Sequence, residues 1–217
     1  MKKLILILAI LLFPFLVKAM TVNIVSDIHA GSSQSCDGWK CIPKWKESFQ
    51  KFLNETKGTI ITVGDNTDKA SKEYAKQLRE ITKGREIYWA NGNHDDKVYV
   101  GGSKHYAFNK DDWRIVIADH KKCSKNDLKW LKNNLKNYKD NKVAVFLHYP
   151  VFKQGSLKKG KDCKSADDLF KKYKVDYVFS GHQHGDNWTR KINGVTYQAI
   201  QGLTNNFKIN YKIMDFN

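Results

Sequence analysis

The sequence contains little proline and no repeated or low-complexity segment. Three prolines in 217 residues are too few for a proline-rich linker between domains. The length fits one domain of ordinary size, and a hydrophobic content of 41% is enough to build a core. We therefore expect one domain over residues 20–217, preceded by a separate N-terminal segment.

The N-terminal segment has an apolar run that is short for a membrane span. The run from Leu4 to Val17 has 14 residues, whereas a spanning helix needs about 20. Two lysines precede the run and the small residue Ala19 follows it, which is typical of a secretory signal peptide over residues 1–19. An uncleaved anchor is the alternative. No cysteine follows the run directly, so we expect no lipoprotein anchor, and a mature protein that is secreted or periplasmic without a stable membrane anchor.

The sequence has no CxxC pair, which makes a site built from cysteines alone a poor candidate. It has four cysteines, an even number, and thiols in exported proteins tend to oxidise. Two disulfides are expected, and four cysteines allow three pairings. Proximity favours Cys36 with Cys41, which leaves Cys123 with Cys163. Four free thiols would fit a reducing compartment instead.

Acidic residues are scarce relative to basic ones, 22 against 38, and the net charge is +16. Removal of residues 1–19 takes away three lysines and lowers the charge to +13. Such a field attracts phosphorylated ligands or nucleic acid. The alternative is that most lysines only solvate helix faces and loops. The same two interpretations apply to Lys158, Lys159, Lys161 and Lys164, which could bind a second phosphate.

Short apolar runs alternate with helical patterns over most of the chain, and the last segments contain only strand patterns. The expected helices cover residues 43–57, 69–82, 124–138 and 165–173; Ser124 and Asp127 start the third like a capping box, and Leu128, Leu131, Leu135 and Tyr138 form its buried face. The expected strands cover 21–26, 59–63, 86–90, 106–108, 113–118, 143–147, 177–180, 188–192, 195–200 and 209–216. Alternation followed by a meander predicts an α/β fold, a four-layer α/β/β/α sandwich of two stacked mixed sheets with outer helices.

Polar side chains gather where the expected strands end. Five of the seven histidines belong to this set, which consists of Asp27, His29, Asp65, Asn93, His94, His148, His182 and His184. In open α/β sheets, ligands bind in the crevice beyond the carboxyl ends of the strands. We therefore expect separate stretches of the chain to converge on one crevice.

These residue types are metal ligands. Asp27 and His29 are two positions apart, so in extended chain both side chains point to one side, and His182 and His184 repeat that spacing. Carboxylate, amide and imidazole groups without thiolate suit Mn²⁺, Fe or Zn²⁺, and eight such groups are too many for one tetrahedral ion. Two divalent ions are expected, with Asp65 as the bridging carboxylate. Each motif alone is common in ordinary turns, so the prediction depends on the ordered set.

The ordered set D-x-H, G-D-x-x-D, G-N-H-D, a lone histidine after a strand and G-H-x-H resembles the calcineurin-like metallophosphoesterase family from Asp27 to His184. The stretches WRIVIAD, SKNDLKWLKNNL, VAVFLHYP and YVFSGHQH are similar to the branch that contains cyclic-nucleotide phosphodiesterases and purple-acid-phosphatase-like enzymes. The resemblance implies an exported hydrolase of phosphate mono- or diesters that depends on two metals.

The resemblance also implies roles for the residues. Asp27, His29 and His184 would hold one ion, Asn93, His148 and His182 the other, and Asp65 would bridge them. A metal-bound hydroxide would attack phosphorus in line, and His94 would protonate the leaving oxygen. Asp68 would orient His94, unless it is a plain loop residue. Purple acid phosphatases carry a ferric-ion-ligating tyrosine at the position of Asp68, so we expect no Fe³⁺ site of that type.

Two other functions remain open. The basic charge favours an extracellular nuclease acting on DNA or RNA, although the sequence shows no stacking platform of basic and aromatic residues. A catalytically silent scaffold of the same fold is the alternative from a different class. The substrate would be a phosphorylated small molecule or a nucleotide, selected by the loops at 30–42 and 153–164.

Overall fold

A computed structural model describes residues 20–32, 45–118, 124–138, 142–152, 164–185, 187–205 and 208–216. The expected signal peptide, the four cysteines and most of the lysine-rich loop lie outside these residues, so the predictions made for them stay predictions. Within the described ranges, no helix is both long enough and apolar enough to cross a membrane.

The first sheet has four strands in the order β12-β1-β2-β3. Strands β1 (Met20–Val25), β2 (Thr59–Val63) and β3 (Ile87–Ala90) are parallel, and β12 (Lys212–Phe216) pairs antiparallel with β1. Helices α1 (Trp45–Glu55) and α2 (Lys72–Ile81) connect the parallel strands. The short strands β10 (Thr204–Asn205) and β11 (Lys208–Ile209) form a separate pair before β12.

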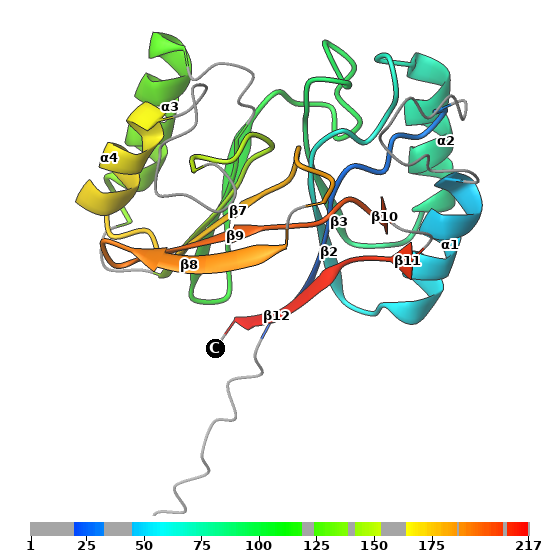
Figure 1. Cartoon of the computed structure of the whole chain (residues 1–217). Coiled ribbons are helices and arrows are strands. Elements are labelled where there is room, and N and C mark those ends of the chain that lie inside the picture. The colour runs from blue at the N-terminus through cyan, green and yellow to red at the C-terminus, as the bar shows by residue number, and fades with distance from the viewer. Residues whose placement is uncertain are drawn as a thin grey trace, which may run out of the picture.

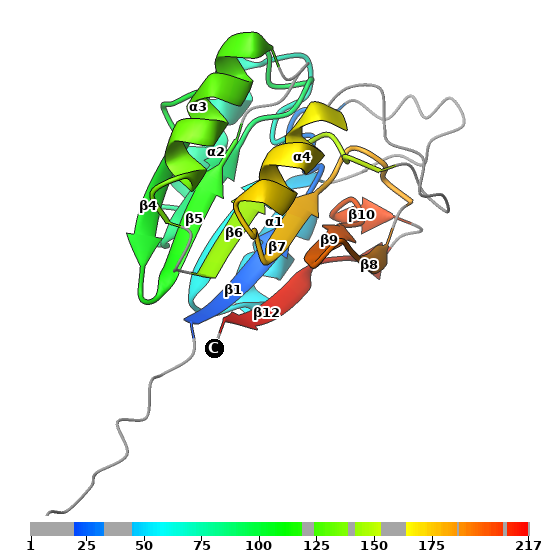
Figure 2. The ribbon, with the colours of Figure 1, turned by 90° about the vertical axis from the view of Figure 1, so that its left-hand side faces the viewer.

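The second sheet has six strands in the order β4-β5-β6-β7-β9-β8. Its central strands β5 (Trp113–Ile117), β6 (Lys142–Phe146), β7 (Tyr177–Ser180) and β9 (Val195–Ala199) are parallel. Strands β4 (Tyr106–Lys110) and β8 (Trp188–Ile192) pair antiparallel at the two edges. Helices α3 (Lys125–Leu135) and α4 (Lys164–Lys172) lie side by side over its outer face (Figure 2).

One hydrophobic cluster lies between each pair of adjacent layers, which gives three clusters for four layers. Each strand contributes to the clusters on both sides of its sheet, because its alternate residues point to opposite faces. On β6, Ala144 and Phe146 pack between the two sheets, whereas Val143 and Val145 pack under α3 and α4. A third cluster joins the first sheet to α1 and α2. Figure 1 shows the two helix pairs on opposite outer sides. The predicted α/β/β/α sandwich is confirmed.

Local sequence signals set the helix starts. Ser124 accepts a hydrogen bond from the Asp127 backbone, and the Asp127 carboxylate accepts one from the Ser124 backbone, so the predicted capping box is present. The buried face of α3 is narrower than expected. Leu131 and Leu135 are fully buried, but Leu128 and Tyr138 are half-buried, because they pack at the margin of the cluster.

The C-terminal strands differ from the expected meander. Residues 209–216 do not form one strand: β11 ends at Ile209, and β12 begins at Lys212 and pairs with β1 of the other sheet. The chain changes sheets here, held by hydrogen bonds from the Leu203 amide to the Ser26 carbonyl and from the Asn210 amide to the Leu203 carbonyl. The crossing brings the segment after β9 against the end of β1.

Candidate metal centre

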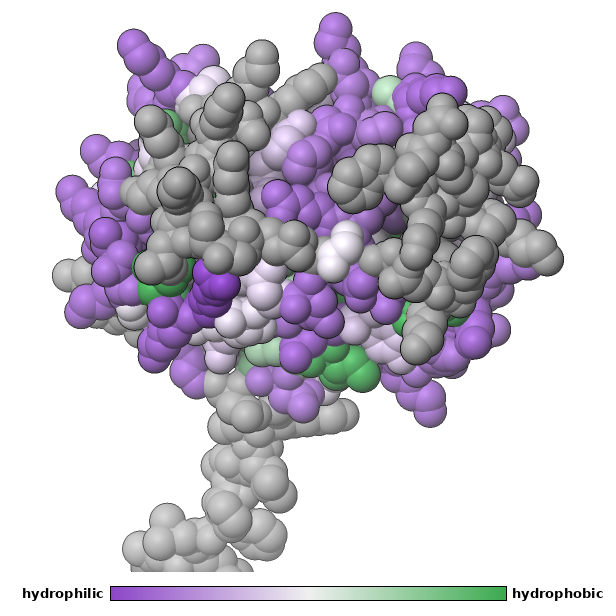
Figure 3. Space-filling view, in the orientation of Figure 1, coloured by the Kyte–Doolittle hydropathy of each residue, from purple (hydrophilic) through white to green (hydrophobic). Residues whose placement is uncertain are grey.

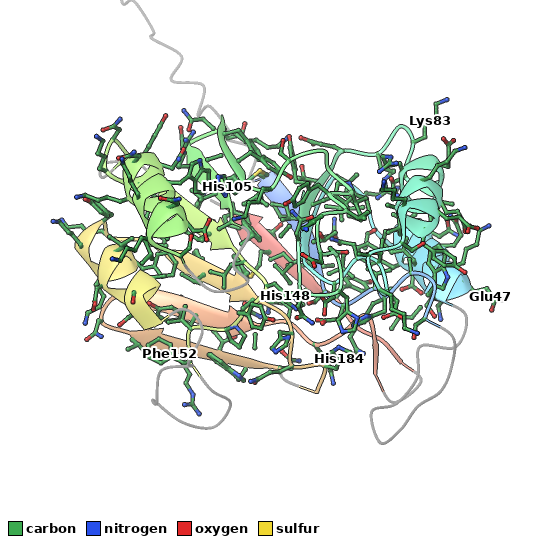
Figure 4. All side chains as sticks on the ribbon, turned by 90° about the horizontal axis from the view of Figure 1, so that it is seen from above. Glu47, Lys83, His105, His148, Phe152 and His184 are labelled. Carbon is green, nitrogen blue, oxygen red and sulfur yellow. The ribbon has the colours of Figure 1, made fainter. Side chains whose placement is uncertain are left out.

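The predicted site residues lie in five loops at one edge of the two sheets. Each loop directly follows a parallel strand: β1 leads to Asp27 and His29, β2 to Asp65, β3 to Asn93 and His94, β6 to His148, and β7 to His182 and His184. In Figure 4, His148 and His184 approach this edge from the two different loops of the second sheet. The structure therefore brings together all the residues that the motifs singled out.

One group of ligand atoms is formed by Asp27, His29, Asp65 and His184. Nε2 of His29 lies 3.0 Å from Nε2 of His184, and Nε2 of His184 lies 3.2 Å from Oδ1 of Asp27. Nε2 of His29 lies 3.7 Å from Oδ2 of Asp65. These nitrogens and oxygens face a common point, as ligands of one cation do. We call this group position 1.

A second group contains Asp65, His148 and His182. Nε2 of His148 lies 3.2 Å from Oδ2 of Asp65 and 3.1 Å from Oδ1 of Asn93. The rings of His148 and His182 lie 5.0 Å apart at a steep angle. We call Asn93, His148 and His182 with Asp65 position 2. Asp65 is the one carboxylate that belongs to both positions, as the bridge of a two-ion centre must.

The Asp27 carboxylate is held by one oxygen, and its other oxygen is left for a ligand. Oδ2 accepts hydrogen bonds from the Ser26 hydroxyl and, at 3.2 Å, from the His182 amide. Oδ1 is buried, and Nε2 of His184 lies 3.2 Å from it. When the His184 ring carries its proton on Nδ1, Oδ1 and Nε2 both present lone pairs, and a cation between them would satisfy both atoms, so this oxygen fits a metal ligand.

Asp65 and His148 are oriented in the same way. Oδ1 of Asp65 accepts the His94 amide at 2.8 Å, which directs Oδ2 to the two positions. Nδ1 of His148 donates to the Val63 carbonyl at 2.9 Å, so the neutral ring presents the lone pair of Nε2. Metal-binding histidines are commonly fixed by such a bond from the other ring nitrogen.

The charges in the centre favour a bound cation. Burial alone would raise the pKa of Asp27 and Asp65, but their histidine neighbours outweigh it and hold both pKa values below the ordinary range. Burial alone would lower the pKa of His148, but the adjacent Asp65 raises it to about 9. The environment of Nε2 therefore stabilises positive charge, and a divalent ion supplies that charge without the proton.

The backbone adopts a strained conformation at four of the site residues. Asp27, His29, Asp65 and His182 have φ values of 52°, 48°, 51° and 71°. Positive φ is costly for such residues and is concentrated at functional sites. Gly64, at φ 97°, has a separate reason: a Cβ there would lie 2.6 Å from the His148 ring. These tight loops position the ligands. In the sequence, only Gly64 indicated a turn, and the positive φ values of the four ligands were not predictable.

His94 and Asp68 form a pair beside position 1. Nδ1 of His94 lies 2.9 Å from Oδ1 of Asp68, and the His94 side chain is 39% exposed. The His94 ring meets the His29 ring edge to face at 4.6 Å. The contact with Asp68 leaves Nε2 of His94 available to a bound substrate, so this geometry suits a proton donor fixed by a carboxylate.

Asp95 is a buried residue that the motif analysis did not assign. It accepts hydrogen bonds from the backbones of Asn66, Thr67 and Gly92 and from the side chains of Asn66 and Thr67. Burial raises the pKa of Asp95 to about 6 despite these bonds. Asp95 ties the loop that carries Asp65 to the loop that carries Asn93. Its place as the first acidic residue of the GNHDD stretch was the available signal.

The face shown in Figure 3 is mainly hydrophilic where its residues are described. Among the described residues, the one large hydrophobic side chain classed as exposed is Ile213, on the edge strand β12. This surface therefore suits a polar or charged substrate.

Comparisons with known proteins identify the family and agree with the fold. The family model described as calcineurin-like phosphoesterase matches residues 20–186, which include every proposed ligand. No curated protein sequence matches the chain significantly.

Solved structures with the same fold include phosphatases. A dimetal phosphatase from Danio rerio superposes with a TM-score of 0.69 at 12% identity, covering 92% of this chain and 93% of that one. A purple acid phosphatase from yellow lupin (Lupinus luteus) seeds gives 0.58 at 15%, covering 83% and 43%. GAP50, the anchor in the inner membrane complex of Plasmodium, gives 0.59 at 16%, covering 83% and 71%. At these identities the likeness shows a shared fold.

Proposed function

The chain belongs to the calcineurin-like phosphoesterase family, and we propose that it is an exported hydrolase of phosphate mono- or diesters that works with two divalent metal ions. The observation that carries the proposal is the shared carboxylate. Oδ2 of Asp65 faces His29 of position 1 and His148 of position 2, at 3.7 Å and 3.2 Å. A single-ion or purely structural site has no need of such a bridge.

Two ions held at these positions would supply an activated water and charge stabilisation for the phosphoryl oxygens. The protein's own residues provide the rest. His94 gives a proton from Nε2 to the leaving oxygen, while the Asp68 carboxylate at 2.9 Å holds the other ring nitrogen. The ligand oxygens and nitrogens suit Mn²⁺, Fe or Zn²⁺. Since residue 68 is Asp, a tyrosinate ligand to Fe³⁺ is not part of the proposal.

For the substrate we propose a phosphorylated small molecule or a nucleotide. A nuclease is the second candidate, and the net charge of +13 that remains after removal of residues 1–19 (+16 less three lysines) favours it. The salt dependence of binding and cleavage distinguishes a nuclease from a hydrolase of small phosphoesters. Binding of single-stranded DNA through many phosphates weakens steeply as salt rises, because counterions are released, whereas cleavage of a small ester responds much less. Equal, shallow salt dependence would argue that the lysines have no role in nucleic acid binding.

For the location we propose export, with residues 1–19 as a cleaved signal peptide and a secreted or periplasmic mature chain. The support is the sequence pattern described above. N-terminal sequencing of the exported protein should begin near residue 20, and mass spectrometry without reductant should show two disulfide crosslinks. An intact N-terminus with four alkylatable thiols would contradict the proposal.

The main test is a hydrolysis screen of Mn²⁺-loaded and chelated protein against phosphomonoesters, phosphodiesters, cyclic nucleotides and single-stranded DNA, with bound metal measured in parallel. We expect hydrolysis that depends on two bound ions per chain. Protein that binds two ions and hydrolyses none of these classes would instead be a silent scaffold.

A further inference from the structure

The His182 ring is held differently from the His148 ring. Nδ1 of His148 donates to the Val63 carbonyl at 2.9 Å, which fixes that ring. The backbone amide of His182 donates to Asp27, but within the part of the chain that the structure describes, neither ring nitrogen of His182 forms a hydrogen bond. Metal-binding histidines almost always have such a bond at the second nitrogen. The described contacts that can hold the His182 ring are therefore contacts with other rings.

Tyr149 makes the closest of these ring contacts. Its ring centroid lies 4.3 Å from that of His182 at an interplanar angle of 51°, whereas the His148 ring lies 5.0 Å away. One ring nitrogen of His182 belongs to a group of ligand atoms, with Asp65 and His148, that all lie within 4.8 Å of one another. The ring is thus turned towards position 2, and Tyr149 packs against it in that orientation.

The way in which strands β6 and β7 end produces this contact. The two strands are parallel neighbours, and beyond their ends the Gly181 amide still donates to the His148 carbonyl at 3.0 Å. Tyr149 and His182 are the next residues on the two loops. Pro150 follows Tyr149 and is buried, and a residue before proline is restricted to extended backbone conformations. The half-buried Tyr149 ring is therefore attached to a backbone with little freedom.

A ring that is already oriented loses less conformational freedom when its nitrogen binds an ion. Packing against an aromatic neighbour can therefore do for His182 what a hydrogen bond at the second nitrogen does for His148. Aromatic pairs contribute an amount that corresponds to about a 2- to 12-fold change in an equilibrium constant. The His182 ring is a ligand of position 2 alone, so the effect should be confined to that position.

We propose that Tyr149 is a positioning residue for position 2, whose ring holds the His182 imidazole with one nitrogen towards the ion. The inference rests on the proposed two-ion function and adds a residue outside the ligand motifs. It assigns the effect to the aromatic ring of Tyr149 and not to its hydroxyl group.

Calorimetric titration with Mn²⁺ tests the proposal by measuring the two binding steps separately. Asn93→Ala removes a ligand of position 2 alone and so identifies the step that belongs to this position. We expect Tyr149→Ala to weaken that step by about 2- to 12-fold and to leave the other step unchanged. Tyr149→Phe keeps the ring and should retain both affinities. Unchanged affinities in Tyr149→Ala, equal weakening of both steps, or an equal loss in Tyr149→Phe would overturn the proposal.

Tyr173→Ala is the matched control. Tyr173 is also half-buried and packs at the margin of the cluster under α3 and α4. It precedes the amino end of β7, whereas His182 follows the carboxyl end. The control should keep both metal affinities, and a loss equal to that of Tyr149→Ala would assign the effect to general destabilisation. If thermal unfolding shows that Tyr149→Ala does not fold, Tyr149→Leu replaces it with the same expectation.

The metal-free proteins provide a second measurement, which does not depend on the proposed function. NMR relaxation of the His182 ring should show more motion in Tyr149→Ala than in the wild type or in Tyr173→Ala. A ring that is equally restricted in Tyr149→Ala would overturn the proposal. Wild-type protein with fewer than two Mn²⁺ binding steps would contradict the proposed function instead, so the two can fail independently.

Discussion

The two halves of the metal centre differ in charge and in how their ligands are held. Position 1 has a carboxylate of its own, Asp27, in addition to its share in Asp65. Position 2 has the neutral amide of Asn93 instead. The Asp27 carboxylate is also fixed by two hydrogen bonds, from the Ser26 hydroxyl and the His182 amide. The additional negative charge, on a carboxylate that is fixed in place, should make position 1 the tighter of the two.

With this difference, the chain would hold the ion at position 1 firmly and exchange the ion at position 2 more readily. A tightly held ion at position 1 orients the shared Asp65, and that carboxylate then contributes to position 2. Occupation of position 2 should therefore depend on position 1 more than the reverse. This dependence can be tested with three variants: one that changes a ligand of both positions, one that changes no ligand, and one that affects position 1 alone.

The largest effect is expected for Asp65→Asn, which weakens the one ligand common to both positions. The amide has no negative charge, and its NH₂ group would face His148 or His29. We expect bound metal to fall at both positions and hydrolysis to drop to background. Metal content by mass spectrometry and steady-state rates check this. Wild-type metal content and rate would refute the two-ion assignment, and positions 1 and 2 could then not be compared as two ion sites.

The second largest effect is expected for His94→Ala, which should lower kcat and leave metal binding at both positions unchanged. General acid catalysis contributes about 10² to 10⁴-fold, so kcat should fall by that factor on esters with alkyl-like leaving groups. On nitrophenyl esters the leaving oxygen needs little protonation, and the defect should shrink. Two ions per chain should remain bound.

Other outcomes for His94→Ala are informative. An equal loss on both kinds of ester with intact metals would mean that His94 positions the phosphate. Loss of metal would make it a ligand and would add it to position 1, where its ring meets His29.

The site was predictable from the sequence because its ligands follow parallel strands. Five separate motifs each come after a recognisable apolar run, and the carboxyl ends of parallel strands meet at one edge. The convergence of Asp27 with His184, 157 positions apart, needed no knowledge of contacts. The layers were predictable for the same reason, since alternation along each strand encodes two buried faces.

The parts that were missed depend on contacts between distant segments. Asp95 acts by accepting hydrogen bonds from the Asn66 and Thr67 loop, and nothing local to Asp95 records that partner. The pairing of Val22 with Met214 moves β12 into the first sheet, although the strand pattern of residues 209–216 fits either sheet. The positive φ of Asp27 and His29 is imposed by the packed loops, against the ordinary preference of both residues.

The smallest effect is expected for Ser26→Ala. This variant distinguishes most directly between metal binding at position 1 and at position 2. The Ser26 hydroxyl is fully buried and donates to Oδ2 of Asp27, so it fixes which oxygen faces position 1. Losing a bond that orients a metal ligand typically weakens metal binding by about 10 to 100-fold. We expect that loss at position 1, with binding at position 2 reduced only as far as it depends on position 1.

Ser71→Ala is the matched control, because the Ser71 hydroxyl caps α2 by accepting a bond from the Tyr74 amide and contacts no metal ligand that the structure describes. That variant should lower stability by about 1 kcal/mol and leave both metal affinities unchanged. Calorimetric titration with Mn²⁺ resolves the two binding steps, and thermal unfolding of the metal-free proteins reports any general damage. If Ser26→Ala weakens both steps equally, or changes only the unfolding temperature, Ser26 supports the loop as a whole. If the tighter step alone weakens, the hydroxyl selects the Asp27 oxygen that binds the ion, and the difference between the two positions originates in this hydrogen bond.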